Sequence, residues 1–180
     1  MELWLDAASA RKGPLDPHPA DRVLLATGDS IPNWVDSALF ACDDGRILDT
    51  STHPVGVHVD IGDSEGQEAA KALIGMVSWV VLTTGDWQMI PLENLVAASQ
   101  GSGTKLVARI DSNQAVRGAA FALETGVDAL LLPPNDAEIW TSAQIIAAER
   151  LASRSKGEEI LEEEEMAMNG LIGNVVTSFY

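Results

Sequence analysis

The sequence SWVVLTTGDWQMIPLENLVAASQGSGTKLVARID, residues 78–111, decides the fold class of this chain. Its apolar run from Trp79 to Leu82 has the length of a buried strand. Pro91 suits the first turn of a helix, because proline has no N–H to leave unbonded there, and the apolar spacing of residues 92–98 continues that helix. A second strand is predicted at Lys105–Ile110. Two apolar strands joined by a helix form a βαβ unit, which indicates a parallel sheet covered by helices.

The same stretch resembles a known family. Residues 85–94, GDWQMIPLEN, are similar to the central signature of the type II, archaeal-type 3-dehydroquinate synthases. Residues 106–112, LVARIDS, and residues 123–131, LETGVDALL, resemble the next two blocks, in the family's order and at similar spacing. Three ordered blocks are far more specific than one short motif. The resemblance covers roughly Met1 to Ala152.

Composition and charge restrict the classes of protein that this chain can be. A chain of 180 residues fits one domain, and 46% hydrophobic residues argue against disorder despite a net charge of −16. The negative charge disfavours binding to nucleic acid, because phosphates would be repelled. Cys42 is the single cysteine, so no internal disulfide can form. With no signal pattern and no apolar span of membrane length, we expect a cytoplasmic protein without a membrane partner.

Strands and helices alternate along most of the chain. Helices are expected at 64–76, 91–98, 112–124 and 136–153, with a short helix within 31–42; strands are expected at 1–6, 21–26, 46–49, 55–61, 79–82, 105–110 and 127–132. This order predicts an α/β fold with a mainly parallel sheet and covering helices. Seven strand candidates are compatible with two kinds of sheet, a complete or incomplete TIM-barrel-like sheet and an open doubly wound sheet. We favour the barrel.

The tail is expected to differ from the rest of the chain. We predict an α/β domain at residues 1–153 and a tail at 154–180 that is first acidic and then apolar. The run Glu162–Glu165 is typical of a solvated helix face, which we favour over a metal site. The related family continues into a second, largely β half that has no counterpart here. We therefore expect the tail to be truncated or to begin that half.

Polar residues at the ends of the predicted strands are the candidates for a site, because side chains from parallel strands converge at their carboxyl ends. These residues are Asp6, His58, Asp60, Asp86 and Arg109. The carboxylates would attract a divalent cation or an amine, and the guanidinium could hold a carboxylate. The alternative is that aspartates after strands bond to turn amides or cap the next helix. For Asp29, Asp49 and Asp111 we favour that alternative.

The remaining candidates come from the central motif. Glu93 and Asn94, on the first turn of the helix after Pro91, could bind a hydroxyl- or amine-bearing substrate or the exposed helix amides. The residues alone do not decide whether Asp86 and Glu93 bind a ligand or only backbone amides. The resemblance to the family favours a functional role for both. His58 alternates with two valines and could face a barrel interior as a general base or a metal ligand. Neither a metal-ligand spacing nor a glycine-rich phosphate loop occurs in the sequence.

The resemblance implies a specific reaction. The family oxidatively deaminates 2-amino-3,7-dideoxy-D-threo-hept-6-ulosonate with NAD+, and the product cyclises to 3-dehydroquinate on an early route to aromatic amino acids, the shikimate and chorismate pathway. Relatives form 3-amino-4-hydroxybenzoate from similar amino-keto precursors with a metal ion. We therefore expect an oxidoreductase with a small amino-keto acid as substrate, NAD as cofactor and, in the second case, a divalent metal ion. A third alternative is an inactive homologue with a structural role.

The site predicted on this basis has two groups of residues. The expected catalytic residues are Asp86, His58 and Asp60, and the expected substrate-binding residues are Arg109, Glu93, Asn94 and Asp6. The residues that bind the cofactor or a metal ion are not assigned. A homo-oligomer, or a partner chain that supplies the family's second half, is the expected assembly.

Overall fold

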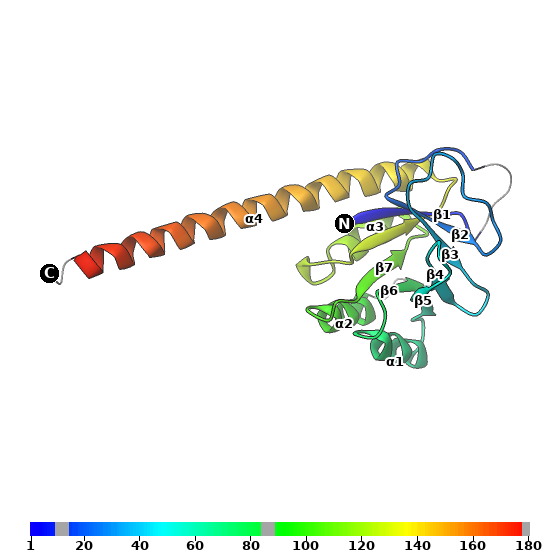
Figure 1. Ribbon diagram of the computed structural model, residues 1–180, viewed down its shortest axis with the longest axis horizontal. Helices are drawn as coiled ribbons and strands as arrows, with labels where there is room; N and C mark the ends of the chain where they lie inside the picture. Colours follow the sequence, from blue (N-terminus) through cyan, green and yellow to red (C-terminus); the bar gives the residue numbers. More distant parts are fainter. Residues whose placement is uncertain (10–14, 84–88, 178–180) are drawn as a thin grey trace. The chain divides into compact units, whose positions relative to one another are not determined.

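The sheet of this protein is a closed barrel. The computed structural model describes residues 1–9, 15–83 and 89–177. Eight strands in these ranges close in sequence order (Figure 1): β1 (Glu2–Asp6), β2 (Arg22–Ala26), β3 (Ala38–Ala41), β4 (Arg46–Leu48), β5 (Pro54–Asp60), β6 (Trp79–Thr83), β7 (Lys105–Arg109) and β8 (Ala129–Leu132). Strand β4 runs antiparallel to β3 and β5, and the other neighbours are parallel. The TIM-barrel-like prediction is confirmed, and the open doubly wound alternative is wrong.

Strand β3 occupies a segment where we expected a short helix. Ala38 to Ala41 pair in parallel with Val23 to Ala26 of β2, and Phe40 pairs with Leu48 of β4. The apolar residues of this segment are compatible with either structure when considered locally. Pairing on both sides fixes the strand, because it satisfies the backbone hydrogen bonds that a gap in the barrel would leave open.

Helices cover only part of the barrel. Helix α1 (Ser64–Leu73) contacts β5 and β6, α2 (Met89–Ser99) contacts β7, and α3 (Asn113–Ala120) contacts β8 (Figure 1). A 3₁₀ turn, η1 (Ala122–Glu124), follows α3, and α4 (Ala137–Thr177) follows β8. The connections β1–β2, β2–β3, β3–β4 and β4–β5 carry no helix in the described residues, unlike those of a regular (β/α)₈ barrel.

The ends of two helices have local causes. Asp63 caps α1, with its Oδ1 accepting from the N–H of Gly66 at 2.8 Å. The helix expected through Glu124 ends at Ala120, because Phe121 leaves the helical region with a φ of −122° and a ψ of 17°. Gly126, after η1, has a left-handed φ of 67°, which glycine adopts readily.

Large apolar side chains fill the barrel interior. They are Trp4, Leu24, Leu39, Ile47, Trp79, Val81, Val107, Ala129 and Leu131. The rings of Trp4 and Trp79 meet edge to face with centroids 4.7 Å apart. Gly56 is paired with Trp79, and a β-carbon on Gly56 would lie 2.6 Å from the Trp79 carbonyl oxygen. The interior is therefore a packed core, and a ligand can enter only at the ends of the strands.

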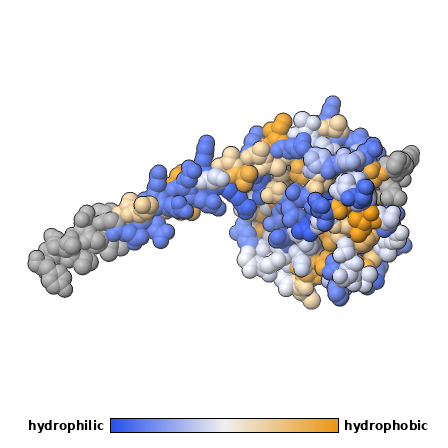
Figure 2. All heavy atoms as spheres, turned by 45° about the horizontal axis from the view of Figure 1, so that its top comes forward, coloured by the Kyte–Doolittle hydropathy of each residue, from blue (hydrophilic) through white to orange (hydrophobic). Residues whose placement is uncertain are grey.

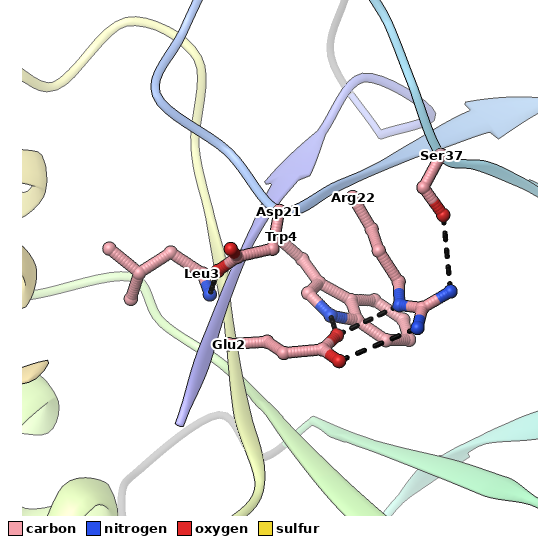
Figure 3. A network of polar contacts seen from close by, with 6 residues as sticks. All are labelled: Glu2, Leu3, Trp4, Asp21, Arg22 and Ser37. Atoms are coloured by element: carbon pink, nitrogen blue, oxygen red, sulfur yellow. Dashed lines mark hydrogen bonds and ion pairs between the residues drawn. The ribbon is translucent and has the colours of Figure 1, made fainter. Parts of the chain in front are cut away.

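A polar network closes the amino-terminal end of the barrel (Figure 3). Glu2 accepts from Trp4 Nε1 at 2.7 Å and from Arg22 Nε at 2.8 Å, and Arg22 also donates to Ser37 at 3.1 Å. The Arg22 guanidinium lies over the ring of Trp79, as does the Lys105 ammonium. Burial raises the pKa of Glu2, but the hydrogen bonds and positive charges outweigh it, so the pKa of this carboxyl is below its ordinary value. The network joins β1, β2 and the segment before β3.

Contacts divide the chain into two units, Met1–Ile146 and Ala147–Tyr180. The barrel belongs to the first, with Ile139, Trp140, Ala143 and Ile146 of α4 buried there. In the second unit α4 continues well past the predicted end at Ser153, and residues 151–169 are exposed. Figure 2 shows mostly hydrophilic side chains along this segment, which agrees with a solvated helix face for Glu162–Glu165. The boundary predicted at residue 153 stays a prediction. Within the described ranges, no helix is long and apolar enough to cross a membrane.

Candidate active site

The carboxyl ends of the parallel strands surround a cavity of about 500 Å³. Asp6 ends β1, Thr83 ends β6 and Arg109 ends β7, and all three line the cavity. The rest of the described lining comes from the connections that follow the strands, and consists of Ser9, Ile110, Asp111, Pro133, Pro134, Asn135 and Asp136. A cavity of this size suits a small metabolite. We call it the mouth cavity.

An ion pair between Asp6 and Arg109 links two strand ends in the mouth cavity. Oδ2 of Asp6 lies 3.3 Å from Nε of Arg109, and Oδ1 accepts from the N–H of Ser9 at 3.1 Å. Asp6 is only 4% exposed, whereas the Arg109 side chain is 36% exposed. Because a guanidinium has five N–H donors in a planar fork, the donors beyond Nε can bind a ligand carboxylate. The site thus presents one negative and one positive group side by side.

His58 is connected to the mouth cavity through Thr83. Nε2 of His58 lies 2.6 Å from Oγ1 of Thr83. His58 pairs with Val81 in the sheet, so its side chain shares the inward face with Val81 and Thr83. His58 is exposed to solvent on one side, but desolvation by the strand ends around it lowers its pKa, and the charge of Arg109 lowers it further, against the opposite effects of Asp6 and Asp60. The neutral imidazole that results at pH 7 can accept a proton.

Asp60, the third predicted catalytic residue, is exposed at the end of β5 and held in a local turn. Its Oδ1 accepts from the N–H of Gly62 at 2.9 Å. Its charge raises the pKa of His58, so the carboxylate is near the imidazole. This geometry suits a residue that stabilises a protonated His58 more than one that meets the ligand directly. Its catalytic role stays a prediction.

Two aromatic side chains hold the wall of the mouth cavity after β8. Trp140 Nε1 donates to the carbonyl of Pro133 at 2.8 Å. Nε2 of His18 lies 2.9 Å from the carbonyl oxygen of Pro134, and the His18 ring is tilted against Trp140 at 5.1 Å. Asp136 caps α4 through bonds from two helix amides. His18 and Trp140 therefore support this wall.

The remaining predicted residues are not brought into the mouth cavity by the described structure. Asn94 is exposed and lines a separate groove between α1 and α2, together with Lys71 and Gln67. Glu93 is half-buried on α2 and is not among the described residues of the mouth cavity. Asp86 lies outside the described residues. The substrate-binding roles of Glu93 and Asn94 and the catalytic role of Asp86 therefore stay predictions.

Sequence reasoning overlooked Thr83 and undervalued Asp111. Thr83 follows Trp79 and Val81 at the two-residue period of a strand, so its place on the inward face could have been found from that alternation. Asp111 lines the cavity, although we favoured a turn or helix-capping role for it. Ser112 takes the N-cap position of α3, without a capping bond from its side chain. Ser9 and Asn135 had no signal, because they lie in connections whose path depends on the whole barrel.

Comparison with known protein families identifies the family of this barrel. Residues 20–146 match the model described as the 3-dehydroquinate synthase II N-terminal domain. The chain belongs to the 3-dehydroquinate synthase II family. The resemblance seen in three sequence blocks is thereby confirmed. No solved structure matches the chain significantly.

Curated relatives in this family come from archaea. A 3-dehydroquinate synthase of Methanothrix thermoacetophila is 36% identical over 98 residues, which are 54% of this chain and 27% of that protein. One from Methanothermobacter thermautotrophicus is 35% identical over 89 residues, or 49% of this chain and 24% of the relative. One from Methanopyrus kandleri is 31% identical over 156 residues, or 80% and 37%. The chain thus matches between about a quarter and just over a third of the length of these 3-dehydroquinate synthases.

The charges around the mouth cavity do not suit the cofactor that we expected from the family. NAD+ carries a pyrophosphate with two negative charges. The charged groups in the described lining are Asp6, Asp111, Asp136 and Arg109, so three carboxylates would face the pyrophosphate beside a single guanidinium. The described lining therefore does not fit the pyrophosphate. Nor do the described residues gather three acidic, histidine or cysteine side chains into a metal site.

Proposed function

We propose that this chain carries the substrate-binding barrel of a 3-dehydroquinate synthase II reaction. In that reaction 2-amino-3,7-dideoxy-D-threo-hept-6-ulosonate is oxidatively deaminated and cyclised to 3-dehydroquinate, in the cytoplasm, for the synthesis of aromatic amino acids. Membership of the family supports the class of reaction. The observation that carries the proposal is the pairing of Asp6 with Arg109 inside a cavity of metabolite size.

The pair suits the head group of this substrate. An α-amino acid has an ammonium and a carboxylate on neighbouring atoms, and the Asp6 carboxylate and the Arg109 guanidinium are also neighbours. The ligand ammonium would bind to Asp6 and the ligand carboxylate to Arg109, so that each charge finds an opposite one. Because Asp6 is almost fully buried, water competes weakly for it, and the interaction is stronger than at an open surface.

Oxidative deamination requires an amine that has lost a proton, since a protonated ammonium holds its electron pair in the N–H bond. His58, whose pKa is lowered by desolvation and by Arg109, is the base that we assign to this step. Asp60 and Asp6 would then stabilise the imidazolium. NAD+ would supply the acceptor for the hydride that this oxidation releases. We assign its binding to residues outside the described mouth, in a second copy of this chain or in a partner chain.

The test is turnover of the amino-keto acid. The purified chain is incubated with the substrate and NAD+, alone and with a chain that contains the rest of a relative, and NADH is followed by absorbance. Production of NADH and 3-dehydroquinate supports the proposal. Product that forms without NAD+ and depends on a divalent metal would assign the chain to the aminohydroxybenzoate-forming relatives. No product in either arm, from protein that still unfolds cooperatively, contradicts an enzymatic role.

A further inference from the structure

We propose that the Thr83 hydroxyl is a catalytic group, which takes the proton from the ligand ammonium while passing its own proton to His58. The inference deepens the proposed function and rests on it. Thr83 lies outside the three sequence blocks that resemble the family, and it was not among the polar residues expected at the strand ends.

The arrangement of three groups carries this inference. Thr83 lines the mouth cavity, and among the described residues of that lining His58 does not occur. Yet Nε2 of His58 is within 2.6 Å of Thr83 Oγ1. The hydroxyl therefore contacts the imidazole and also borders the space where a ligand binds. Asp6 and Arg109, which would hold the head group, line the same cavity as Thr83. A ligand anchored by the pair would therefore lie in the same cavity as the Thr83 hydroxyl.

A hydroxyl suits this position because it can donate and accept a hydrogen bond at once. In the step proposed here, one N–H bond of the ligand ammonium breaks and a new O–H bond forms on Thr83 Oγ1. The original Thr83 O–H bond breaks, and its proton forms an N–H bond with His58 Nε2. The products are a neutral amine and an imidazolium, and no atom is oxidised or reduced. A distance of 2.6 Å between the oxygen and the nitrogen is short enough for direct transfer.

The surroundings of His58 favour this direction of transfer. The charged groups that act on it are Arg109 of β7, Asp6 of β1 and Asp60 of β5. Arg109 keeps the imidazole neutral before the ligand arrives. A ligand carboxylate on Arg109 would offset that positive charge, so the imidazole gains basicity when the substrate binds. Binding and proton transfer are thereby linked through one guanidinium.

The test uses Thr83→Val, which keeps the shape of threonine without its hydroxyl, and Thr83→Ser, which keeps the hydroxyl. Two readouts are taken on the full chain. One is the ¹⁵N NMR signal of the His58 ring with and without the amino-keto acid. The other is kcat/KM for NADH formation against pH, measured with the complementing chain if that is required. Circular dichroism and the melting temperature show whether each variant is folded.

Four results are expected. Thr83→Val lowers kcat/KM by about 100-fold, in the range of a lost general acid–base group, and Thr83→Ser restores most of it. The decline of kcat/KM at low pH, caused by protonation of His58, disappears in Thr83→Val. Thr83→Val combined with His58→Gln is no slower than either single variant, since both residues act in one chain of transfer. The ligand moves the ¹⁵N signal of His58 to that of an imidazolium in wild type and Thr83→Ser, whereas in Thr83→Val only the smaller shift caused by the changed charge at Arg109 remains.

The outcomes separate this inference from the proposed function. If wild type forms NADH and Thr83→Val keeps the same rate and pH profile, the relay is wrong and the function stands. If no NADH forms but the ligand protonates the His58 ring only when residue 83 has a hydroxyl, the relay stands and the reaction is wrong. If the ligand leaves His58 unchanged in folded wild type and no NADH forms, both are wrong.

Discussion

Oδ2 of Asp6 lies 3.3 Å from Nε of Arg109, which joins the ends of β1 and β7 across the mouth of the barrel. Strand β8 lies between these two strands in the sheet. The ion pair therefore connects two strands that are not adjacent in the sheet, at the opening of the barrel where a ligand would enter. Two properties follow from this one contact, the stability of the mouth and its preference for ligands that carry both charges.

The first prediction concerns Asp6→Asn. The substitution removes a buried negative charge and leaves Arg109 without its partner, so we expect the free energy of unfolding to fall by about 1–3 kcal/mol. The matched control is Asp60→Asn at the exposed end of β5, which should change it by less than about 0.5 kcal/mol. Urea denaturation measures both. Equal effects would show that the pair contributes nothing to stability.

The second prediction concerns the pKa of His58. Arg109 lowers this pKa by charge repulsion, so Arg109→Gln should raise it towards the ordinary value of histidine. Lys105→Gln removes the same charge from the other end of β7 and should leave the pKa of His58 almost unchanged. An NMR titration of the ring provides both values. A pKa that stays constant in Arg109→Gln would place the guanidinium too far from the imidazole to act on it.

The third prediction concerns Glu2 and acid. The pKa of Glu2 is lowered in the folded protein, so its contribution to stability is complete above the unfolded value of about 4.3 and is lost as the pH falls through the lower folded value. Glu2→Gln should reduce the free energy of unfolding by about 1 kcal/mol at pH 7. The gap between wild type and variant should narrow below about pH 4.3. Thermal melts across this pH range test it; a gap that widens in acid contradicts the network in Figure 3.

The fourth prediction concerns Gly126. Its φ is 67°, and a β-carbon there would clash with the carbonyl of Ala120. Gly126→Ala should destabilise the fold by more than about 2 kcal/mol, from backbone strain and overpacking together. Gly101→Ala is the control, because Gly101 has a φ of 73° but open space around it. This control should cost only about 1 kcal/mol. Similar losses in both variants would mean that the clash is relieved without cost.

Much of the barrel could be predicted from the sequence, because its buried strands are apolar runs such as residues 79–82 and 105–110, separated by turn residues. Strand β3 could not be predicted, since the segment Ala38–Ala41 is short and suits a helix as well as a strand. Only its pairing with both neighbouring strands fixes it as a strand. The closure of the sheet likewise depends on β8 meeting β1, a contact between distant segments that no local pattern reports.

The site could be predicted where it depends on the strand ends and not where it depends on the connections. Asp6 and Arg109 end parallel strands, so their meeting follows from topology. Thr83 follows from strand alternation, although a hydroxyl is a weaker signal than a charge. The wall formed by Pro133 and Pro134 could not be predicted, because it depends on hydrogen bonds from His18, which is distant in the sequence, and from Trp140, which lies beyond a turn.

The most direct test of this account is the affinity of the mouth cavity for the amino-keto acid, measured by calorimetry on the full chain, on Arg109→Gln and on Lys105→Gln. Loss of a charged hydrogen-bonding partner typically costs about 1.5–3 kcal/mol, so Arg109→Gln should bind at least 10-fold more weakly than wild type. Lys105→Gln, at the opposite end of the same strand, should bind as wild type does. Equal affinities of all three proteins would contradict a binding site at Asp6 and Arg109.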